Sequence, residues 1–184
     1  MVVIENMDYL IRKADLSDAQ SLAKIQSESW SAAYKDIAPV EELAKFSKIE
    51  CWLERFQSML VNPIGEYYIA FHGEAPCGAM VYSQTRDSDL PEYAEIVSMY
   101  ATPPYWNKGL GRAMMEKALY EIQLNEYKCI LLWVLKENNR ARKFYEKFGF
   151  VADGAEKESH LSNRAKLVRY RLKIRSDGEA GSES

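Results

Sequence analysis

Histidine and cysteine are scarce in this chain of 184 residues, and their scarcity argues against several kinds of site. The two histidines, His72 and His160, stand far apart, so a histidine-rich metal centre is not expected. The three cysteines, Cys51, Cys77 and Cys129, are odd in number and widely separated. This pattern is typical of reduced thiols in a cytosolic protein and not of a disulfide framework or a zinc site.

The chain also lacks a long apolar run and an excess of basic residues. No window approaches the roughly 20 apolar residues that span a bilayer, and no charged N-terminal segment precedes a long apolar stretch as in a signal peptide. A formal net charge of −3 argues against nucleic-acid binding as the main task. We therefore expect a cytoplasmic protein that has neither a membrane nor a nucleic acid as its partner.

What is present is an ordinary globular composition, with 47% hydrophobic and 28% charged residues. A chain of this length can bury a substantial core, and one domain is its simplest organisation. We expect that domain to span residues 1–174. The last residues, 175–184, are rich in Gly, Ser and Glu without an apolar anchor, so a disordered tail is expected there.

Hydrophobic periodicity and turn residues divide the domain into strands and helices. Alternating or continuous apolar runs predict strands over 9–14, 66–72, 78–85, 93–101, 129–135 and 166–174, with one more strand before the last. Helical spacing predicts helices over 14–34, about 40–60, 111–126 and 138–149. This order indicates an α/β (α+β) fold in which a mixed sheet carries helices on both faces.

The stretch PPYWNKGLGRAM, residues 103–114, joins a predicted strand to a predicted helix through two glycines. The first N–H groups of a helix lack partners within it and carry partial positive charge, and glycine lets an anion approach them. Lys108 and Arg112 add charge beside Gly109 and Gly111. The dinucleotide fingerprint and the P-loop are both absent, because neither spacing pattern is completed. A phosphate cradle and a plain connecting turn both remain open from this stretch alone.

A second pattern follows the predicted strand 129–135. It is the series N-x-x-A-x-x-F-Y-x-x-x-G-F, made by Asn138, Ala141, Phe144, Tyr145, Gly149 and Phe150. With the glycine turn, this series resembles the GNAT superfamily of acyl-CoA-dependent N-acetyltransferases over roughly residues 8–173. That family's pyrophosphate motif, Q/R-x-x-G-x-G/A, is matched at both glycines, but Trp106 stands in place of the Gln or Arg.

The resemblance implies a mostly antiparallel sheet whose fourth and fifth strands splay apart to admit acetyl-CoA, the acyl donor, without a metal ion. The pantetheine arm would pair with backbone groups of the fourth strand at Met99, Tyr100 and Ala101. The pyrophosphate would be wrapped by the backbone of Asn107, Lys108, Gly109, Leu110, Gly111 and Arg112. The expected cofactor site is completed by Trp106, beside the cofactor or against the sheet, and by Asn138, Ala141, Lys143 and Phe144.

The resemblance also implies the catalytic residues. Tyr145 matches the general acid that gives its proton to the departing CoA thiolate. Glu95 is the candidate general base, because histone-type relatives place their catalytic glutamate at this spacing before the motif position held by Trp106. The residue pattern alone equally allows Tyr145 to be a core residue and Glu95 to be a solvated glutamate at the start of a strand.

The expected activity is transfer of an acetyl group to a primary amine of a small molecule or a peptide. Four aromatic residues could line the acceptor cleft or belong to the core: Trp30, Tyr34, Trp52 and Phe56. Three acidic residues of one loop would attract a cationic amine or are simply solvated: Asp87, Asp89 and Glu92. A non-catalytic module that binds or senses acyl-CoA is the alternative function, and a homodimer stays open.

Overall fold

The computed structural model describes residues 9–36, 38–159 and 162–174 of the chain. The tail expected over 175–184 lies outside the described residues, so its disorder stays a prediction. Within the described part, strands and helices follow the predicted order closely.

The described strands form one seven-stranded sheet in the order β1-β2-β3-β4-β5-β7-β6. They are β1 (Tyr9–Lys13), β2 (Glu66–His72), β3 (Ala75–Gln84), β4 (Ala94–Ala101), β5 (Cys129–Leu135), β6 (Val151–Ser159) and β7 (Ser162–Lys173). Neighbouring strands are antiparallel except β4 and β5, which run parallel. The mixed, mostly antiparallel sheet predicted from the sequence is confirmed.

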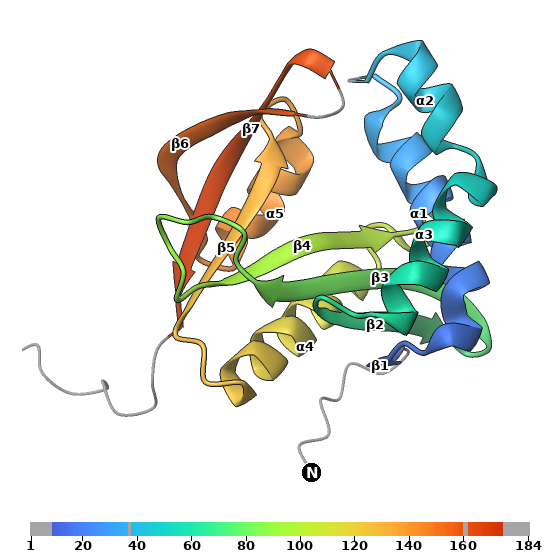
Figure 1. The fold of residues 1–184 in the computed structure, drawn as a ribbon, viewed down its shortest axis with the longest axis horizontal. Coiled ribbons are helices and arrows are strands. Elements are labelled where there is room, and N and C mark those ends of the chain that lie inside the picture. Colours follow the sequence, from blue (N-terminus) through green and yellow to red (C-terminus); the bar gives the residue numbers. More distant parts are fainter. Residues whose placement is uncertain (1–8, 37, 160–161, 175–184) are drawn as a thin grey trace, which may run out of the picture.

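Helices lie on both sides of this sheet (Figure 1). They are α1 (Ala19–Tyr34), α2 (Val40–Phe46), α3 (Ile49–Val61), α4 (Leu110–Leu124) and α5 (Asn139–Lys147), with the short 3-10 helices η1 (Leu16–Asp18) and η2 (Pro103–Tyr105). Figure 1 shows α1, α2 and α3 gathered beside the right-hand half of the sheet, with α4 crossing beneath it.

The two-sided arrangement follows from the alternation of side chains along the strands. Tyr67 and Ile69 of β2 pack with α1 and α3 in one apolar cluster. Tyr68, between them in sequence, packs with α4 in the other cluster. Every fourth residue of α4 is apolar, which makes a stripe along the helix, and the four residues of this stripe, Leu110, Met114, Ala118 and Ile122, are at most 1% exposed.

β4 and β5 pair only at their first residues, Ala94–Ile96 against Ile130–Leu132. Beyond these pairs the two strands diverge, as Figure 1 shows. β3 continues along the other edge of β4, and β7 continues along the other edge of β5. The facing edges of β4 from Val97 and of β5 from Trp133 therefore have no ladder partner, and the predicted splay is confirmed.

A β-bulge lies in β4 where the sheet opens. Val81 of β3 pairs with Ser98, whereas the next residue, Tyr82, pairs with Ile96. Val97 is therefore one extra residue on β4. Such a bulge bends its strand and changes the direction in which side chains and backbone groups point.

The single helix predicted over about 40–60 is wrong, because the chain forms two helices there, α2 and α3. The hydroxyl of Ser47 donates a hydrogen bond to the carbonyl of Leu43, and the hydroxyl of Ser27 donates one to the carbonyl of Ser47 at 2.6 Å. The backbone then turns extended at Lys48 (φ −87°, ψ 126°). Side-chain bonds of this kind compete with the helical ladder and favour a break.

Candidate active site

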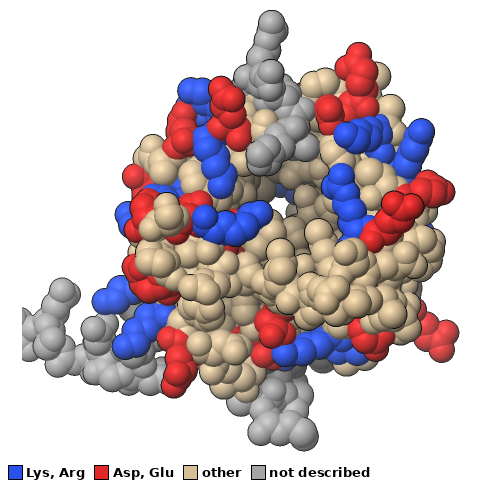
Figure 2. Space-filling view, viewed as in Figure 1, with Lys and Arg blue, Asp and Glu red and all other residues tan. Residues whose placement is uncertain are grey.

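A cleft of about 1170 Å³ occupies the space between the diverging strands. One wall is the free edge of β4 with the end of α1, and the other is β5 with α5. Figure 2 shows the surface hollowed between the part of the molecule that holds α1–α3 and the part that holds β5–β7. The cleft is large enough for an extended ligand of more than drug size.

The glycine turn forms one end of this cleft. Asn107 and Gly109 both adopt the left-handed region, with φ of +58° and +87°, and α4 begins directly afterwards at Leu110. Gly109 has open space where a side chain would stand. An anion can therefore closely approach the first backbone N–H groups of this 15-residue helix.

Gly111 has a second role, which is packing. A Cβ atom at this position would lie 3.4 Å from the ring of Phe144 on α5. This is an ordinary van der Waals distance, so the start of α4 packs directly against α5 at Gly111. A phosphate cradle and a close helix contact are both consistent with this glycine.

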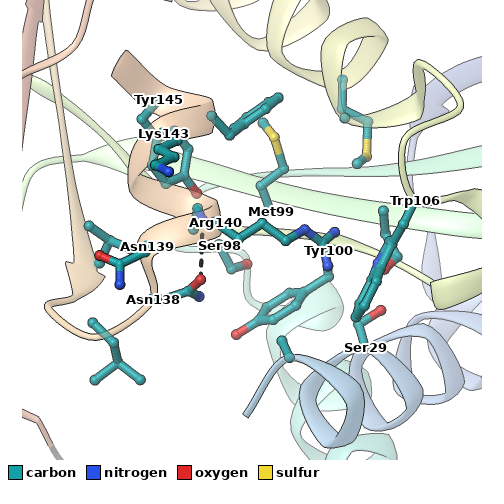
Figure 3. A pocket seen from close by; sticks show the side chains of 18 of the residues that line it. Ser29, Ser98, Met99, Tyr100, Trp106, Asn138, Asn139, Arg140, Lys143 and Tyr145 are labelled. Atoms are coloured by element: carbon teal, nitrogen blue, oxygen red, sulfur yellow. Dashed lines mark hydrogen bonds between the residues drawn. The ribbon is translucent and has the colours of Figure 1, made fainter. Parts of the chain in front are cut away.

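Trp106 is held against the end of β4 by its indole N–H, which donates a hydrogen bond of 2.6 Å to the carbonyl of Ala101. The guanidinium of Arg140, on α5, lies 3.6 Å from the centre of the indole ring. Figure 3 shows the Arg140 side chain reaching across the cleft to the face of Trp106. The two walls are therefore joined by a cation–π contact at the motif position where the sequence departs from the family.

Arg140 was missed by sequence analysis. Among the described residues no carboxylate forms an ion pair with it, and partial burial lowers its pKa below the usual arginine value. The clue in the sequence was its position in the series NNRA between Asn138 and Ala141. That position alone does not say that the side chain reaches Trp106.

Positive charge dominates the cleft lining. Four cationic residues line it, Arg112, Arg140, Lys143 and Lys147, against two acidic ones, Asp36 and Glu137. Of the four, Arg112 is already paired with Glu116 of the same helix at 2.7 Å. The three remaining cations exceed the two acidic residues by one charge, which favours an anionic ligand such as a phosphate ester.

The start of α5 is fixed by Asn138. Its side-chain oxygen accepts a hydrogen bond of 3.1 Å from the backbone N–H of Ala141, drawn as a dashed line in Figure 3. This is an N-cap, which satisfies one of the unpaired donors of the helix. Asn138 and Ala141 also line the cleft, so the cap lies at its wall.

Tyr145 lies inside the cleft, near Tyr100 of β4 and Tyr34 of α1. Burial raises the pKa of Tyr145, and the Tyr100 phenol adds to the rise. Burial also raises the pKa of Tyr34 and of Tyr100. All three phenols are thus kept in the protonated form, in which a hydroxyl can donate a proton or a hydrogen bond.

Glu95 is buried and does not line the cleft. Its carboxylate accepts hydrogen bonds from the Arg86 side chain at 2.5 and 3.0 Å and from the Arg86 backbone N–H at 3.1 Å. Glu95 is 1% exposed, so it is not the solvated glutamate that the residue pattern allowed. The Glu95 carboxylate is therefore engaged in an ion pair with Arg86.

The acidic loop before β4 is also engaged. Asp87 accepts hydrogen bonds of 3.0 Å from Arg169 and from the indole N–H of Trp133. Asp89 is paired with Arg169 at 2.9 Å, and Lys157 lies 3.7 Å from Asp87. Two of the three acidic residues expected to attract a cationic amine are therefore neutralised within the molecule.

Most of the predicted site residues meet in the cleft. Those that line it are Met99, Tyr100, Ala101, Trp106, Asn107, Gly109, Gly111, Arg112, Asn138, Ala141, Lys143, Phe144 and Tyr145. Three others, Glu95, Lys108 and Leu110, do not line it, and Leu110 is fully buried. Residues that sequence analysis did not single out include Ser29, Val97, Ser98, Asn139 and Arg140.

No group of three or more His, Cys, Asp or Glu side chains in residues 9–36, 38–159 and 162–174 could hold a metal ion. Within the same ranges no helix has the length and apolar character needed to cross a membrane.

Comparison with protein families matches residues 20–150 to the acetyltransferase (GNAT) family. The match spans more than half of the chain, and the chain belongs to this family. The fold and the cleft between the diverging strands agree with that membership.

Individual relatives are distant. An uncharacterized N-acetyltransferase of Mycobacterium tuberculosis is 26% identical over 141 residues, which cover 76% of this chain and 86% of the relative. A spermidine N(1)-acetyltransferase of Thermoplasma acidophilum is 23% identical over 150 residues, covering 82% and 92%. The solved structure of PaiA N-acetyltransferase from the same organism, in complex with coenzyme A, has a TM-score of 0.72 at 21% identity and covers 91% of this chain and all of that one. The likeness to that structure shows the shared fold.

Proposed function

We propose that the protein transfers an acetyl group from acetyl-CoA to a primary amine of a small molecule or a peptide. The observation that carries the proposal is the cleft between β4 and β5, which has the glycine turn at one end and Tyr145 inside it. The free edge of β4 suits the pantetheine amides, and the cationic lining and the helix start suit the phosphates. Tyr145 lies inside the cleft, where it can serve the thioester.

The residues present fit this co-substrate. Backbone groups of Met99, Tyr100 and Ala101 lie on the unpaired edge of β4 and can pair with pantetheine amides. The left-handed turn at Asn107 and Gly109 presents backbone N–H groups to the pyrophosphate. Arg140, fixed on the face of Trp106, supplies the side-chain cation that position 106 itself lacks.

Acetyl-CoA supplies the acetyl group as a thioester, whose C–S bond breaks when the neutral amine forms the new C–N bond. Backbone N–H groups beside the bulge at Val97 can polarise the carbonyl. Tyr145 then gives its phenolic proton to the CoA thiolate, and the proton lost by the newly acetylated nitrogen returns through water to the Tyr145 phenolate. Because burial raises the pKa of Tyr145, the phenol holds this proton across the ordinary pH range.

The identity of the general base that takes the proton from the amine is a separate proposal. Glu95 could accept the ammonium proton through water only if Arg86 moved aside, and Arg86 has a 62% exposed side chain that can do so. A water chain leading out of the cleft is the other route. Replacement of Glu95 by glutamine distinguishes the two routes.

A non-catalytic acyl-CoA-binding module is not favoured. Such a module needs the cradle but has no use for a phenol kept protonated beside the thioester position. Tyr145 and the family membership therefore support the enzyme.

The proposed function is tested by titrating acetyl-CoA calorimetrically and following release of the CoA thiol with a panel of amines. We expect saturable one-to-one binding and thiol release that depends on the amine. Binding without amine-dependent release would favour the non-catalytic module, and the absence of binding would refute both functions.

Replacing Arg140 by alanine should weaken binding of CoA and of dephospho-CoA equally, by about tenfold to a hundredfold. One hydrogen bond to a charged group contributes about 1.5–3 kcal/mol, and about 1.4 kcal/mol corresponds to tenfold in Kd. Dephospho-CoA lacks only the 3′-phosphate, so equal losses assign Arg140 to the pyrophosphate. Calorimetric titration of both ligands gives the two values.

Arg142→Ala is the matched control. Arg142 lies on the same helix, but its guanidinium donates to the Tyr170 hydroxyl and the Lys136 carbonyl, both outside the cleft lining. Its replacement should leave both affinities unchanged. If Arg140→Ala weakens CoA alone, the arginine serves the 3′-phosphate, and if it weakens neither ligand, the assignment is wrong.

A further inference from the structure

A second, smaller cavity of about 370 Å³ lies on the α1–α3 side of the sheet. Its walls come from α1, α3, β2, β3 and β4, and from the segment that follows α3. The residues that line it are Gln26, Trp52, Arg55, Phe56, Met59, Ile64, Gly65, Tyr67, Val81, Ser83, Gln84, Arg86, Val97 and Ser98. Trp52 and Phe56, two of the four aromatic candidates for the acceptor site, are among them.

The two cavities share part of their lining on β4. Val97 and Ser98 line both of them, and Val97 is the extra residue of the β-bulge. An amine can attack a thioester only if both groups reach the same few ångströms of space. If the thioester lies along β4 as proposed, the second cavity, which has the bulge in its lining, is the adjacent space from which an amine can approach it.

The lining of the second cavity is apolar, with cations and without anions. Among the described residues that line it, none is Asp or Glu, and two are arginines, Arg55 and Arg86. Arg86 is neutralised by Glu95, whereas Arg55 forms no ion pair with a described carboxylate. The Arg55 guanidinium lies 5.2 Å from the centre of the Trp52 ring, so its charge stays beside the cavity.

We propose that the second cavity takes the acceptor, and that this acceptor is a single primary amine on an apolar, ring-sized body rather than a polycation. The inference rests on the proposed function. Aromatic and aliphatic side chains such as Phe56, Met59 and Val81 favour an apolar body. The Arg55 charge, which no described carboxylate neutralises, repels a second positive charge on the acceptor.

An apolar acceptor cavity also bears on the deprotonation of the amine. Removing an ammonium group from water disfavours its charged form and lowers its pKa. The acceptor can therefore lose its proton on entering the cavity, with no carboxylate among the described residues that line it. This is consistent with Glu95 being occupied by Arg86.

The test compares 2-phenylethylamine with spermidine as acceptors. We expect a kcat/KM for 2-phenylethylamine at least about tenfold above that for spermidine, the scale of one apolar or charge contact. Calorimetric binding of each amine to the CoA-saturated protein should give the same order. A preference for spermidine in the binding measurement would overturn the inference, whatever the turnover shows.

Two variants of α3 provide the matched control. Met59→Glu adds a carboxylate to the lining at a position that is already 38% exposed, so folding should survive. It should shift the preference at least about tenfold toward spermidine. Gln57→Glu makes the same charge change on the same helix outside the lining and should leave the preference unchanged. Equal shifts in both variants would overturn the inference.

Failure of the inference and failure of the proposed function give different results. If spermidine is acetylated and 2-phenylethylamine is not, the chain is an acetyltransferase, but its acceptor is a polycation and not an apolar amine. If neither amine nor any other gains an acetyl group while CoA binds, the proposed transfer fails. The amine-binding measurement still decides the occupant of the cavity in that case.

Discussion

Replacing Tyr145 by phenylalanine should lower kcat by about 10²–10⁴-fold, the usual contribution of a positioned general acid. The Kd for CoA should stay within about twofold of the wild-type value, because phenylalanine keeps the ring that packs against Phe144 and Phe150. Steady-state thiol release gives kcat, and calorimetry gives Kd. A thermal unfolding curve close to that of the wild type confirms that the variant is folded.

The pH dependence of turnover provides a second view of the same residue. Burial raises the pKa of Tyr145 above the ordinary phenol value of about 10, so the acid form persists as the pH rises. The kcat should therefore climb as the bound amine loses its proton, and it should not fall at any pH up to about 10. A falling limb between about pH 8 and 10 would contradict the assignment of Tyr145 as the acid.

The largest expected effect on stability comes from Arg86→Ala, with a loss of about 3 kcal/mol in the free energy of unfolding. The loss arises because Glu95, 1% exposed, is left as a buried carboxylate without its cation. Removing one partner of a buried pair costs about 3–5 kcal/mol, and the exposure of Arg86 places this pair at the lower end. Urea unfolding at neutral pH measures the change.

Glu95→Gln is the control for this prediction. The amide occupies the same place, and the largely exposed Arg86 can turn toward water, so the loss of stability should be smaller. The double variant should be more stable than Arg86→Ala alone, because it leaves no buried charge. If Arg86→Ala and Glu95→Gln destabilise equally, the pair is not governed by the buried carboxylate.

The same glutamine variant decides the catalytic role of Glu95. The role of Glu95 as the general base is a prediction. A large fall in kcat with little loss of stability in Glu95→Gln would support it. An unchanged kcat would favour a water chain as the route for the proton. The role of Glu95 would then be structural, as the ion-pair partner of Arg86.

The elements that form the cleft could be predicted from the sequence because their signals are local. The boundaries of β4 and β5 follow from apolar runs, and the stripe on α4 follows from a four-residue repeat. The series from Asn138 to Phe150 marks α5 in the same way. These patterns are set by neighbours in the chain, and tertiary packing did not override them.

Contacts between distant parts of the chain could not be predicted. Arg169 lies 82 positions from Asp87, and no local pattern indicates that it neutralises the acidic loop. The Arg140–Trp106 contact likewise depends on how α5 is placed against the start of α4. The bulge at Val97 arises from pairing with β3 and leaves no mark in the composition of β4.

The departure at Trp106 gains a physical explanation from the structure. Its indole N–H is satisfied by the Ala101 carbonyl, and its face carries the Arg140 guanidinium. The family motif keeps a polar side chain at this position, whereas here the charge comes from the opposite wall of the cleft. The sequence left two positions open for Trp106, beside the cofactor or against the sheet. In the structure its indole is hydrogen-bonded to β4, and the residue also lines the cleft.

The central claim is that an acetyl group passes from acetyl-CoA in the β4–β5 cleft to an amine. The most direct measurement is mass spectrometry of the amine after incubation with the protein and acetyl-CoA, alongside the amount of CoA thiol released. The account predicts an N-acetylated amine in amounts equal to the released thiol, and almost none with Tyr145→Phe. Thiol release without an acetylated amine, or acetylated amine formed equally well by Tyr145→Phe, would contradict it.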